Sequence, residues 1–507
     1  MNKRNWHFST LPFHPFLVAV FPVLSLYVHN MQQSRLAEIV LPLAFAIVVA
    51  LLGLSASWVL LRSLRGAAMA TSAFLLVFFS YGHLYLALRS LLPSRHLIVG
   101  IALAWVGMLL LVAVVLLVRR TGELADKMSK IANVVSFVGV LVLLVSILAF
   151  ELRRSSQIQS LERETGLVET GVGAGSSDSL RDIYYIVMDR YPNLETLRDI
   201  YGYDNSPFID YLRSAGFYVA LGSRCNYART DMSLPSSLNM TYINEEVDSC
   251  GEGSSPEVLR QMIQDHRLWR FLESRGYSFV HLGTQWGPTG YNSLADLNIN
   301  RLLLSDFAMT FYKTTALYPL GAALGFDRRK EQWRRVLCKF DLLPRLPDSV
   351  KPRFVFAHFL LPHEPYVFSP QGRFVSRFEQ MQLGEERGFV NQLLYANHRL
   401  MRCVDALLSC AGPKPIVVLQ ADEGPHPPEN FSSRSDISDL RARFGILNAC
   451  FLPSGDTTCL YQSITPVNTF RVILNQYFGT DMDLLADRCY DYDDGCFIDV
   501  TARVRSE

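Results

Sequence analysis

Three acidic residues stand directly after two short apolar runs. Asp189 follows Ile183-Tyr-Tyr-Ile-Val-Met, and Asp422 and Glu423 follow Ile416-Val-Val-Leu-Gln-Ala. Such runs predict buried strands, and ligands of open α/β sheets bind at the carboxyl ends of strands. Three carboxylates gathered there would raise one another's pKa unless a cation neutralised them. Because oxygen ligands favour hard cations, the pattern indicates a site for one divalent cation, Mn²⁺, Mg²⁺ or Ca²⁺. The alternative is that the three are separate surface carboxylates.

A hydroxyl group that could act as a nucleophile is present at Thr230. It follows Arg229 in a loop that becomes helix-like at Thr230-Asp-Met-Ser. A hydroxyl at a helix N-terminus, beside a metal ion and Arg229, can ionise and attack phosphorus or sulfur. We therefore expect Thr230 to be both nucleophile and metal ligand, with Arg229 binding the substrate. The alternative is a threonine that only caps the helix.

Three histidines lie close to the same predicted strand ends. His358 lies inside the apolar run 354–361, His363 follows it in Pro-His-Glu-Pro-Tyr, and His426 follows Asp-Glu-Gly-Pro. A histidine here can bind an anionic ester oxygen or protonate a leaving group. We expect His363 to be catalytic and His358 and His426 to bind substrate, although His358 could instead be a buried histidine with a structural role.

The elements that must position these residues belong to an α/β domain. Residues 180–507 alternate apolar runs with amphipathic stretches, a pattern typical of a mostly parallel sheet. Strands are predicted at 183–189, 277–282, 354–361 and 415–422. Helices are predicted from Ser206 to Gly216, over 391–408 and from Thr465 to Gly479.

The first 151 residues have a different composition and predict a membrane module. Five segments are apolar enough to cross a membrane: 11–29, 39–61, 67–88, 97–118 and 131–150. The first lacks a small-residue cleavage site, which argues against a removable signal peptide. With the N-terminus inside, eight Lys and Arg residues flank the spans on the cytoplasmic side and five on the other. Five spans then place the later domain outside the cytoplasm.

The remaining composition is consistent with this division. Residues 152–179 mix charges with Gly and Ser, which predicts a juxtamembrane helix or coil and then a flexible linker. All nine cysteines lie between Cys225 and Cys496, which fits an oxidising compartment, with Cys450–Cys459 and Cys489–Cys496 as candidate local pairs. The formal net charge of +1 argues against a nucleic-acid partner.

Residues 180–480 resemble the sulfatase-like branch of the alkaline phosphatase superfamily. The architecture is similar to lipoteichoic acid synthases and related phosphoglycerol or phosphoethanolamine transferases. The resemblance rests on segments in this order: Tyr-Tyr-Ile-Val-Met-Asp-Arg, Tyr-Gly-Tyr-Asp-Asn-Ser-Pro-Phe with Gly-Phe-Tyr-Val, Thr230 with Ser-Leu-Pro-Ser-Ser-Leu-Asn, His-Phe-Leu-Leu-Pro-His-Glu-Pro-Tyr, and Leu-Gln-Ala-Asp-Glu-Gly-Pro. Phe-Gly-Ile-Leu-Asn-Ala and Ser-Ile-Thr-Pro-Val-Asn-Thr-Phe add support.

The resemblance implies a role for each matching residue. Asp189 matches the metal ligand after the first strand, and Thr230 the metal-bound nucleophile of the transferases. Asp422 matches the aspartate of the family's Asp-His-Gly motif, and His363 a histidine that contacts the substrate ester. The implied reaction is a two-step displacement through a covalent phospho-enzyme.

Two departures from the family pattern keep alternatives open. Glu423 stands where the motif has histidine; it can still bind a hard cation, or it can mark an inactive homologue that serves as an envelope-assembly scaffold. Cys225-Asn-Tyr-Ala-Arg229 has the Cys-to-Arg spacing of classical sulfatases but lacks their central Pro or Ala, so sulfate-ester hydrolysis is the enzymatic alternative.

The sequence thus predicts a multi-pass protein of the bacterial inner membrane. Its extracytoplasmic domain would be a metal-dependent transferase or hydrolase of phosphoesters. The expected partners are a phospholipid or lipid-linked donor and an envelope glycan acceptor.

Overall fold

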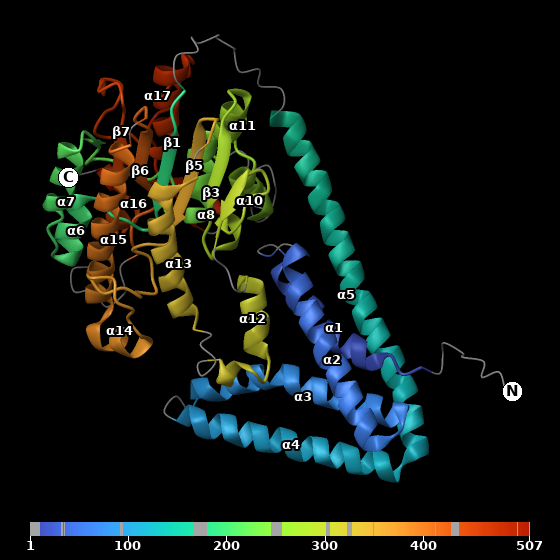
Figure 1. Cartoon of the computed structure of the whole chain (residues 1–507). Helices are drawn as coiled ribbons and strands as arrows, with labels where there is room; N and C mark the ends of the chain where they lie inside the picture. Colours follow the sequence, from blue (N-terminus) through green and yellow to red (C-terminus); the bar gives the residue numbers. More distant parts are fainter. Residues whose placement is uncertain are drawn as a thin grey trace. The chain divides into compact units, whose positions relative to one another are not determined.

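The computed structural model describes most of the chain. It covers residues 11–505 except 32–33, 35, 92–94, 166–179, 245–255, 301–304, 322–326, 348, 411, 427–435 and 494. The Gly/Ser-rich part of the predicted linker and Cys250 therefore lie outside the described residues. The chain divides into two compact units, residues 1–159 with 303–327, and residues 160–302 with 328–507 (Figure 1).

The first unit is a bundle of apolar helices. It contains α1 (His14–Asn30), η2 (Leu36–Ile39), α2 (Val40–Leu61), α3 (Leu64–Leu91), α4 (His96–Arg120) and α5 (Gly122–Thr165). Four helical stretches are long and apolar enough to cross a membrane: 36–61, 64–89, 98–120 and 126–153. The first of the five predicted spans is a shorter apolar helix of 17 residues, α1.

The two units can be compared with the predicted domain boundaries at two places. The helix α5 continues 14 residues past position 151, to Thr165, into the residues where a juxtamembrane helix or coil was expected. Residues 303–327, which carry α12 (Asp306–Thr314) and η5 (Tyr318–Leu320), group with the first unit although they lie inside the predicted catalytic domain. The reason is that Phe307 and Phe311 of α12 pack into the apolar core of the bundle.

A seven-stranded, mostly parallel sheet forms the centre of the second unit. Its order is β2-β7-β6-β1-β5-β3-β4, and β7 pairs antiparallel with both β6 and β2 (Figure 1). The strands are β1 (Ile183–Met188), β2 (Tyr218–Val219), β3 (Ser278–Leu282), β4 (Leu297–Ile299), β5 (Arg353–Phe359), β6 (Ile416–Ala421) and β7 (Asn448–Phe451). This topology and the apolar helices before it confirm the predicted fold class.

Both faces of the sheet are buried under helices. Side chains alternate along β1, so Tyr184, Ile186 and Met188 enter one apolar core and Ile183, Tyr185 and Val187 the other. The helices are α6 (Leu194–Tyr201), α7 (Ser206–Ser214), α8 (Thr230–Asn239), α10 (Pro256–Gln264), α11 (Arg267–Ser274), α13 (Arg328–Leu342), α14 (Arg377–Leu383), α15 (Glu385–Leu408), α16 (Asp436–Phe444), α17 (Pro466–Phe478) and α18 (Thr501–Arg505). The short 3₁₀ turns are η4 (Gly287–Thr289) and η6 (Leu343–Arg345).

A separate hairpin near the C-terminus corrects one predicted cysteine pair. In β8 (Tyr490–Asp493) and β9 (Cys496–Asp499), Tyr490 pairs with Asp499 and Asp493 with Cys496. Cys489 and Cys496 therefore lie at opposite ends of the hairpin, too far apart for a disulfide bond. All eight cysteines of the described residues are free thiols, Cys450 and Cys459 included.

Candidate active site

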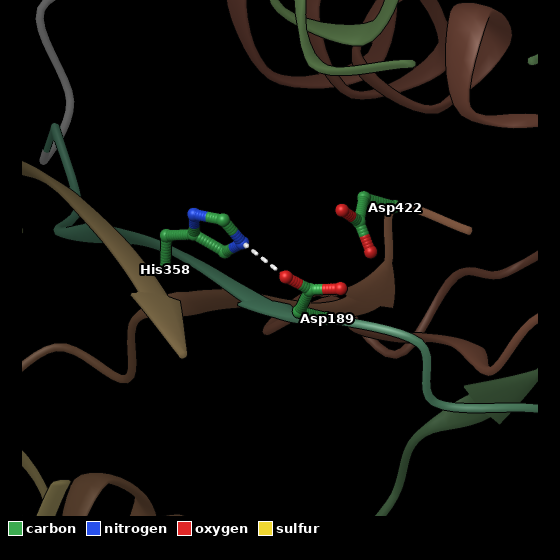
Figure 2. Close-up of side chains that lie close together, drawn as sticks. All are labelled: Asp189, His358 and Asp422. Atoms are coloured by element: carbon green, nitrogen blue, oxygen red, sulfur yellow. Dashed lines mark ion pairs between the residues drawn. The ribbon is translucent and has the colours of Figure 1, made fainter. Parts of the chain in front are cut away.

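Strand register brings three of the predicted residues to one end of the sheet. The central strand β1 pairs with β5 on one side and β6 on the other. His358 of β5 lies opposite Val187, and Asp189 and Asp422 come one residue after the paired Met188 and Ala421. Because strand side chains alternate, His358, Asp189 and Asp422 all point to the face that Val187 occupies. Figure 2 shows the imidazole and the two carboxylates turned toward one another.

These three side chains form a compact and buried group of metal-ligand type. Asp189, His358 and Asp422 each offer one ligand atom, and those atoms lie within 4.8 Å of one another. His358 Nε2 is 3.8 Å from Asp189 Oδ2 (Figure 2). Within the described part of the chain, Asp189 Oδ1, His358 Nε2 and Asp422 Oδ2 are buried and have no hydrogen-bond partner. Buried polar atoms normally have partners, so this arrangement fits a divalent cation.

The electrostatics of the group lead to the same conclusion. Burial and the neighbouring Asp422 and Glu423 hold the pKa of Asp189 well above its usual range. Burial and Glu423 raise the pKa of Asp422 to about 7. Burial lowers the pKa of His358 well below its usual value, with Lys339 as the next cause. The charged forms of the carboxylates are thus costly without a compensating positive charge, and the imidazole stays neutral, as a metal ligand must.

A second layer of hydrogen bonds orients His358. Its Nδ1 lies 2.9 Å from the hydroxyl of Thr289, which in turn lies 2.8 Å from the hydroxyl of Thr284. A proton on Nδ1 that is donated to Thr289 leaves the lone pair of Nε2 facing Asp189. Lys339 of α13 donates to the backbone carbonyl of His358. Sequence reasoning did not identify Thr289, because no local pattern marks a residue 69 positions from its partner.

Glu423 lies next to this group but has other partners. Its Oε1 accepts from Arg190 Nε at 3.1 Å, and its Oε2 is 3.3 Å from His426 Nε2. Glu423 was predicted to be a metal ligand and His358 to bind substrate. In the structure the cluster of possible metal ligands contains His358 and not Glu423. His426 is exposed and reaches the site only through Glu423.

Thr230 is the first residue of α8, and the N-cap position before it is Arg229, with extended backbone. The Thr230 side chain is close enough to the Asp422 carboxyl to lower its pKa, against the larger opposing effects of burial and Glu423. Ser233, one turn further along α8, donates to the carbonyl of Asp422 at 2.6 Å and so fixes the helix to the end of β6. Thr230 is therefore not a capping residue but a hydroxyl beside a candidate metal ligand.

The other two predicted residues border the site. Arg229 pairs with Asp231 at 2.7 Å and lies over the ring of Tyr492, 5.7 Å from its centroid. The backbone N–H of His363 donates to the carbonyl of Asp189 at 3.3 Å. His363 Nδ1 lies 2.5 Å from the carbonyl of Glu364; a carbonyl can only accept, so Nδ1 carries the proton. Burial and Arg190 lower the pKa of His363, which favours the neutral ring.

Cys225, the alternative nucleophile, is held in the interior of the catalytic unit. The side chain is fully buried and its Sγ lies 3.5 Å from the carbonyl of Arg443. Burial and Cys489 raise the pKa of its thiol well above the usual value. A buried thiol of high pKa is an inert, structural one.

Comparison with known proteins gives matches to solved structures alone. No protein-family model matches the chain, and no curated protein matches it. The C-terminal periplasmic domain of EcEptC from Escherichia coli, in complex with Zn, is similar with a TM-score of 0.44 and 13% identity, over 64% of this chain and 93% of that chain. Lipooligosaccharide phosphoethanolamine transferase A (EptA) from Neisseria meningitidis, an integral membrane protein, is similar with a TM-score of 0.40 and 12% identity. The match covers 91% of this chain and 94% of that chain.

A protein in the alkaline phosphatase superfamily from Vibrio parahaemolyticus gives a TM-score of 0.39 and 11% identity, over 63% of this chain and 74% of that chain. The solved structures similar to this chain thus include phosphoethanolamine transferases and alkaline phosphatase superfamily members, the group that the sequence resembles. At these identities and TM-scores, the similarity fixes neither the activity nor the substrate.

Proposed function

We propose that this chain is a membrane-anchored, metal-dependent phosphotransferase or hydrolase whose nucleophile is Thr230. The observation that carries the proposal is the position of Thr230 at the start of α8, the helix that Ser233 ties to Asp422 of the buried cluster Asp189–His358–Asp422. The Thr230 side chain lowers the pKa of the Asp422 carboxyl. A hydroxyl so placed becomes reactive when its proton is drawn away and positive charge stands nearby. A threonine with a purely structural role needs no such neighbours.

Asp189, His358 and Asp422 would hold the cation, with Thr230 beside them. A bound divalent cation would neutralise the carboxylates and act as a Lewis acid toward an ester oxygen. The donor set of two carboxylates and one imidazole suits Zn²⁺ or Mn²⁺ better than Mg²⁺ or Ca²⁺, which prefer oxygen ligands alone. The proposal therefore keeps Mn²⁺ from the predicted set and adds Zn²⁺.

The chain's own groups supply the remaining parts of a two-step transfer. The N-terminus of α8 presents peptide N–H groups and the positive end of its dipole toward a phosphate. In the first step the Thr230 Oγ–P bond forms, the ester P–O bond breaks, and the proton of the Thr230 hydroxyl passes to the leaving alcohol. In the second step an acceptor hydroxyl, or water, gives its proton to Nε2 of neutral His363 and attacks phosphorus. The Thr230 Oγ–P bond then breaks, and Oγ takes a proton from the protonated His363, which restores both the hydroxyl and the neutral ring.

The membrane unit supports the proposed location and substrates. The shorter apolar helix α1 and four helices of spanning length within the described residues precede the catalytic unit, and the distribution of Lys and Arg favours a cytoplasmic N-terminus. We count α1 as a fifth crossing, which places the catalytic unit outside the cytoplasm of a bacterial inner membrane. Its donor would be a phospholipid or lipid-linked phosphoester, and its acceptor an envelope glycan.

Trapping of the covalent intermediate tests the nucleophile. The full chain in detergent is incubated with Zn²⁺ or Mn²⁺ and a phospholipid donor, quenched in acid and digested for peptide mass spectrometry. We expect phospho-modification on Thr230 in the wild type and none in Thr230→Ala, together with loss of turnover. Thr230→Ser is the matched control, because it keeps a hydroxyl at the same atom. Unchanged turnover in Thr230→Ala would refute the assignment.

Two further measurements separate the alternatives. Formylglycine at Cys225, detected in the same digest, would establish a sulfatase and overturn the proposal. Metal analysis of the purified chain addresses the scaffold: a protein that binds no divalent cation at this cluster would be the inactive homologue.

A further inference from the structure

One segment of the catalytic unit's chain folds as part of the helix bundle. The chain leaves the second unit after β4 and re-enters it at α13, and the residues between group with the first unit. Within this segment lie α12, capped by the Ser305 side chain, and η5. The segment is thus connected at both ends to the catalytic unit and belongs to the bundle by its contacts.

Aromatic side chains of α12 enter the core of the bundle. Phe307 and Phe311 are each 3% exposed. The Phe307 ring meets Tyr27 of α1 edge-on, with centroids 6.2 Å apart, and the Phe311 ring lies 5.5 Å from Phe79 of α3 and 6.3 Å from Phe45 of α2. Because these rings contact three different helices, α12 is held by the bundle rather than by a surrounding lipid phase.

Backbone contacts show that the fit between α12 and α3 is close. The N–H of Ala316 donates to the carbonyl of Phe78 in α3 at 2.8 Å. A Cβ atom added to Gly82 would lie 2.0 Å from the carbonyl oxygen of Lys313 and 2.5 Å from the carbonyl carbon of Thr314. Gly82 therefore allows two backbones to touch at a place where any other residue would separate them.

We propose that residues 305–321 are an intramolecular docking segment, which binds the aromatic side chains of α1, α2 and α3 that contact Phe307 and Phe311. The segment is a second attachment of the catalytic unit to the bundle, independent of the connection through residues 166–179. A chain connection alone would attach the catalytic unit to the bundle at one end. The docked segment adds non-covalent contacts to that covalent attachment.

Cutting the other connection tests the attachment directly. A protease site is inserted within residues 166–179 of the full chain, and membranes carrying the folded protein are cut and sedimented. We expect the 180–507 fragment to remain in the pellet. In Phe307→Asp/Phe311→Asp we expect it to move to the supernatant. The matched control is Phe378→Asp/Met381→Asp on α14, where the replaced side chains are 69% and 73% exposed, and that fragment should stay in the pellet.

A second variant leaves the catalytic unit's sequence untouched. Gly82→Ala lies in α3, and its control Gly100→Ala adds a Cβ whose nearest neighbours are side-chain atoms at 3.4 Å or more. Cross-linking of the pair Phe79→Cys/Phe311→Cys, identified by peptide mass spectrometry, reports docking. We expect a strong cross-link that Gly82→Ala reduces several-fold and Gly100→Ala does not.

Release of the wild-type fragment after cutting would overturn the proposal, as would equal retention of the Phe307→Asp/Phe311→Asp fragment. An absent cross-link in the Cys pair would do the same. None of these readouts measures turnover, so they test the docking segment independently of the proposed activity.

Discussion

The hydroxyl of Thr289 provides the most specific test of the candidate metal centre. Thr289 is buried, and its Oγ1 lies 2.9 Å from Nδ1 of His358. Thr289→Val keeps the size and β-branching of the side chain and removes only the hydrogen-bonding group. The imidazole then loses the partner that fixes its tautomer, and a buried N–H is left unsatisfied whenever Nε2 faces the cation.

The expected loss of metal affinity can be estimated from the effect of hydrogen-bonding partners behind metal-binding histidines. Loss of a hydrogen-bonding partner behind a ligating histidine typically lowers metal affinity by about 10–100-fold. This factor corresponds to about 1.4–2.8 kcal/mol of binding free energy, since each tenfold change is about 1.4 kcal/mol. We expect the effect at the upper end of this range if the proton of Nδ1 has no other acceptor. No described residue besides Thr289 is bonded to Nδ1.

The assay is competition between the purified full chain and a chelator of known affinity for Zn²⁺ or Mn²⁺. Thr465→Val is the matched control, because Thr465 is equally buried and its hydroxyl donates to Asp487 Oδ1 at 2.6 Å, away from the proposed ligands. Thr289→Val loses the hydrogen bonds to His358 and Thr284, and Thr465→Val loses the bond to Asp487, so both variants lose some stability. Unchanged metal affinity in Thr289→Val, or an equal loss in Thr465→Val, would refute the reasoning.

Three further predictions concern the cluster and the domain that holds it. His358→Gln should abolish stoichiometric metal binding, whereas Glu423→Gln should reduce it only modestly; the reverse order in metal analysis would return Glu423 to the ligand set. His266 is buried with a pKa lowered from 6.5 to about 3, so the folded state binds this proton less readily than the unfolded state. Its stabilising contribution is complete above pH 6.5 and falls as the pH drops, by about 1.4 kcal/mol at pH 5.5. Hydrogen exchange of α11 should show this loss in the wild type and not in His266→Asn; an unaltered pH dependence would contradict it. Phe356→Ala, at a buried site on the central β5, should cost about 3–5 kcal/mol of unfolding free energy; a loss below 1 kcal/mol in denaturant unfolding would show that the core relaxes around it.

The strand ends could be predicted from the sequence because the signal there is local. Asp189 and Asp422 each follow a six-residue apolar run, and the structure gives those runs as neighbouring parallel strands. Both carboxylates therefore lie at the same edge of the sheet for reasons visible in the sequence. Each apolar run has the length of a strand, each ends at an acidic residue, and the pattern predicts parallel strands. The same holds for Thr230, whose helix begins at the predicted residue.

The role of His358 could not be predicted because it depends on register. Within the run 354–361 its position shows only that it is buried. Pairing with Val187 decides which face it occupies, and a slip of one residue would turn it away from Asp189. The docking segment could not be predicted for a similar reason. The sequence of α12 indicates only a short amphipathic helix, and its partners on α1, α2 and α3 lie more than 200 residues earlier in the chain.

The charges around the cluster explain how Glu423 fits at a position where the resembling family has histidine. Asp189, Asp422 and Glu423 are buried, and Arg190 is their close cationic neighbour, paired with Glu423. Three carboxylates and one guanidinium leave two negative charges, which one divalent cation neutralises. If Glu423 turned to the cation instead, Arg190 would lose its nearest partner. In the proposed site, the nitrogen ligand that position 423 lacks would come from His358 of β5, whose Nε2 lies 3.8 Å from Asp189 Oδ2. A carboxylate at 423 is therefore compatible with an intact metal site.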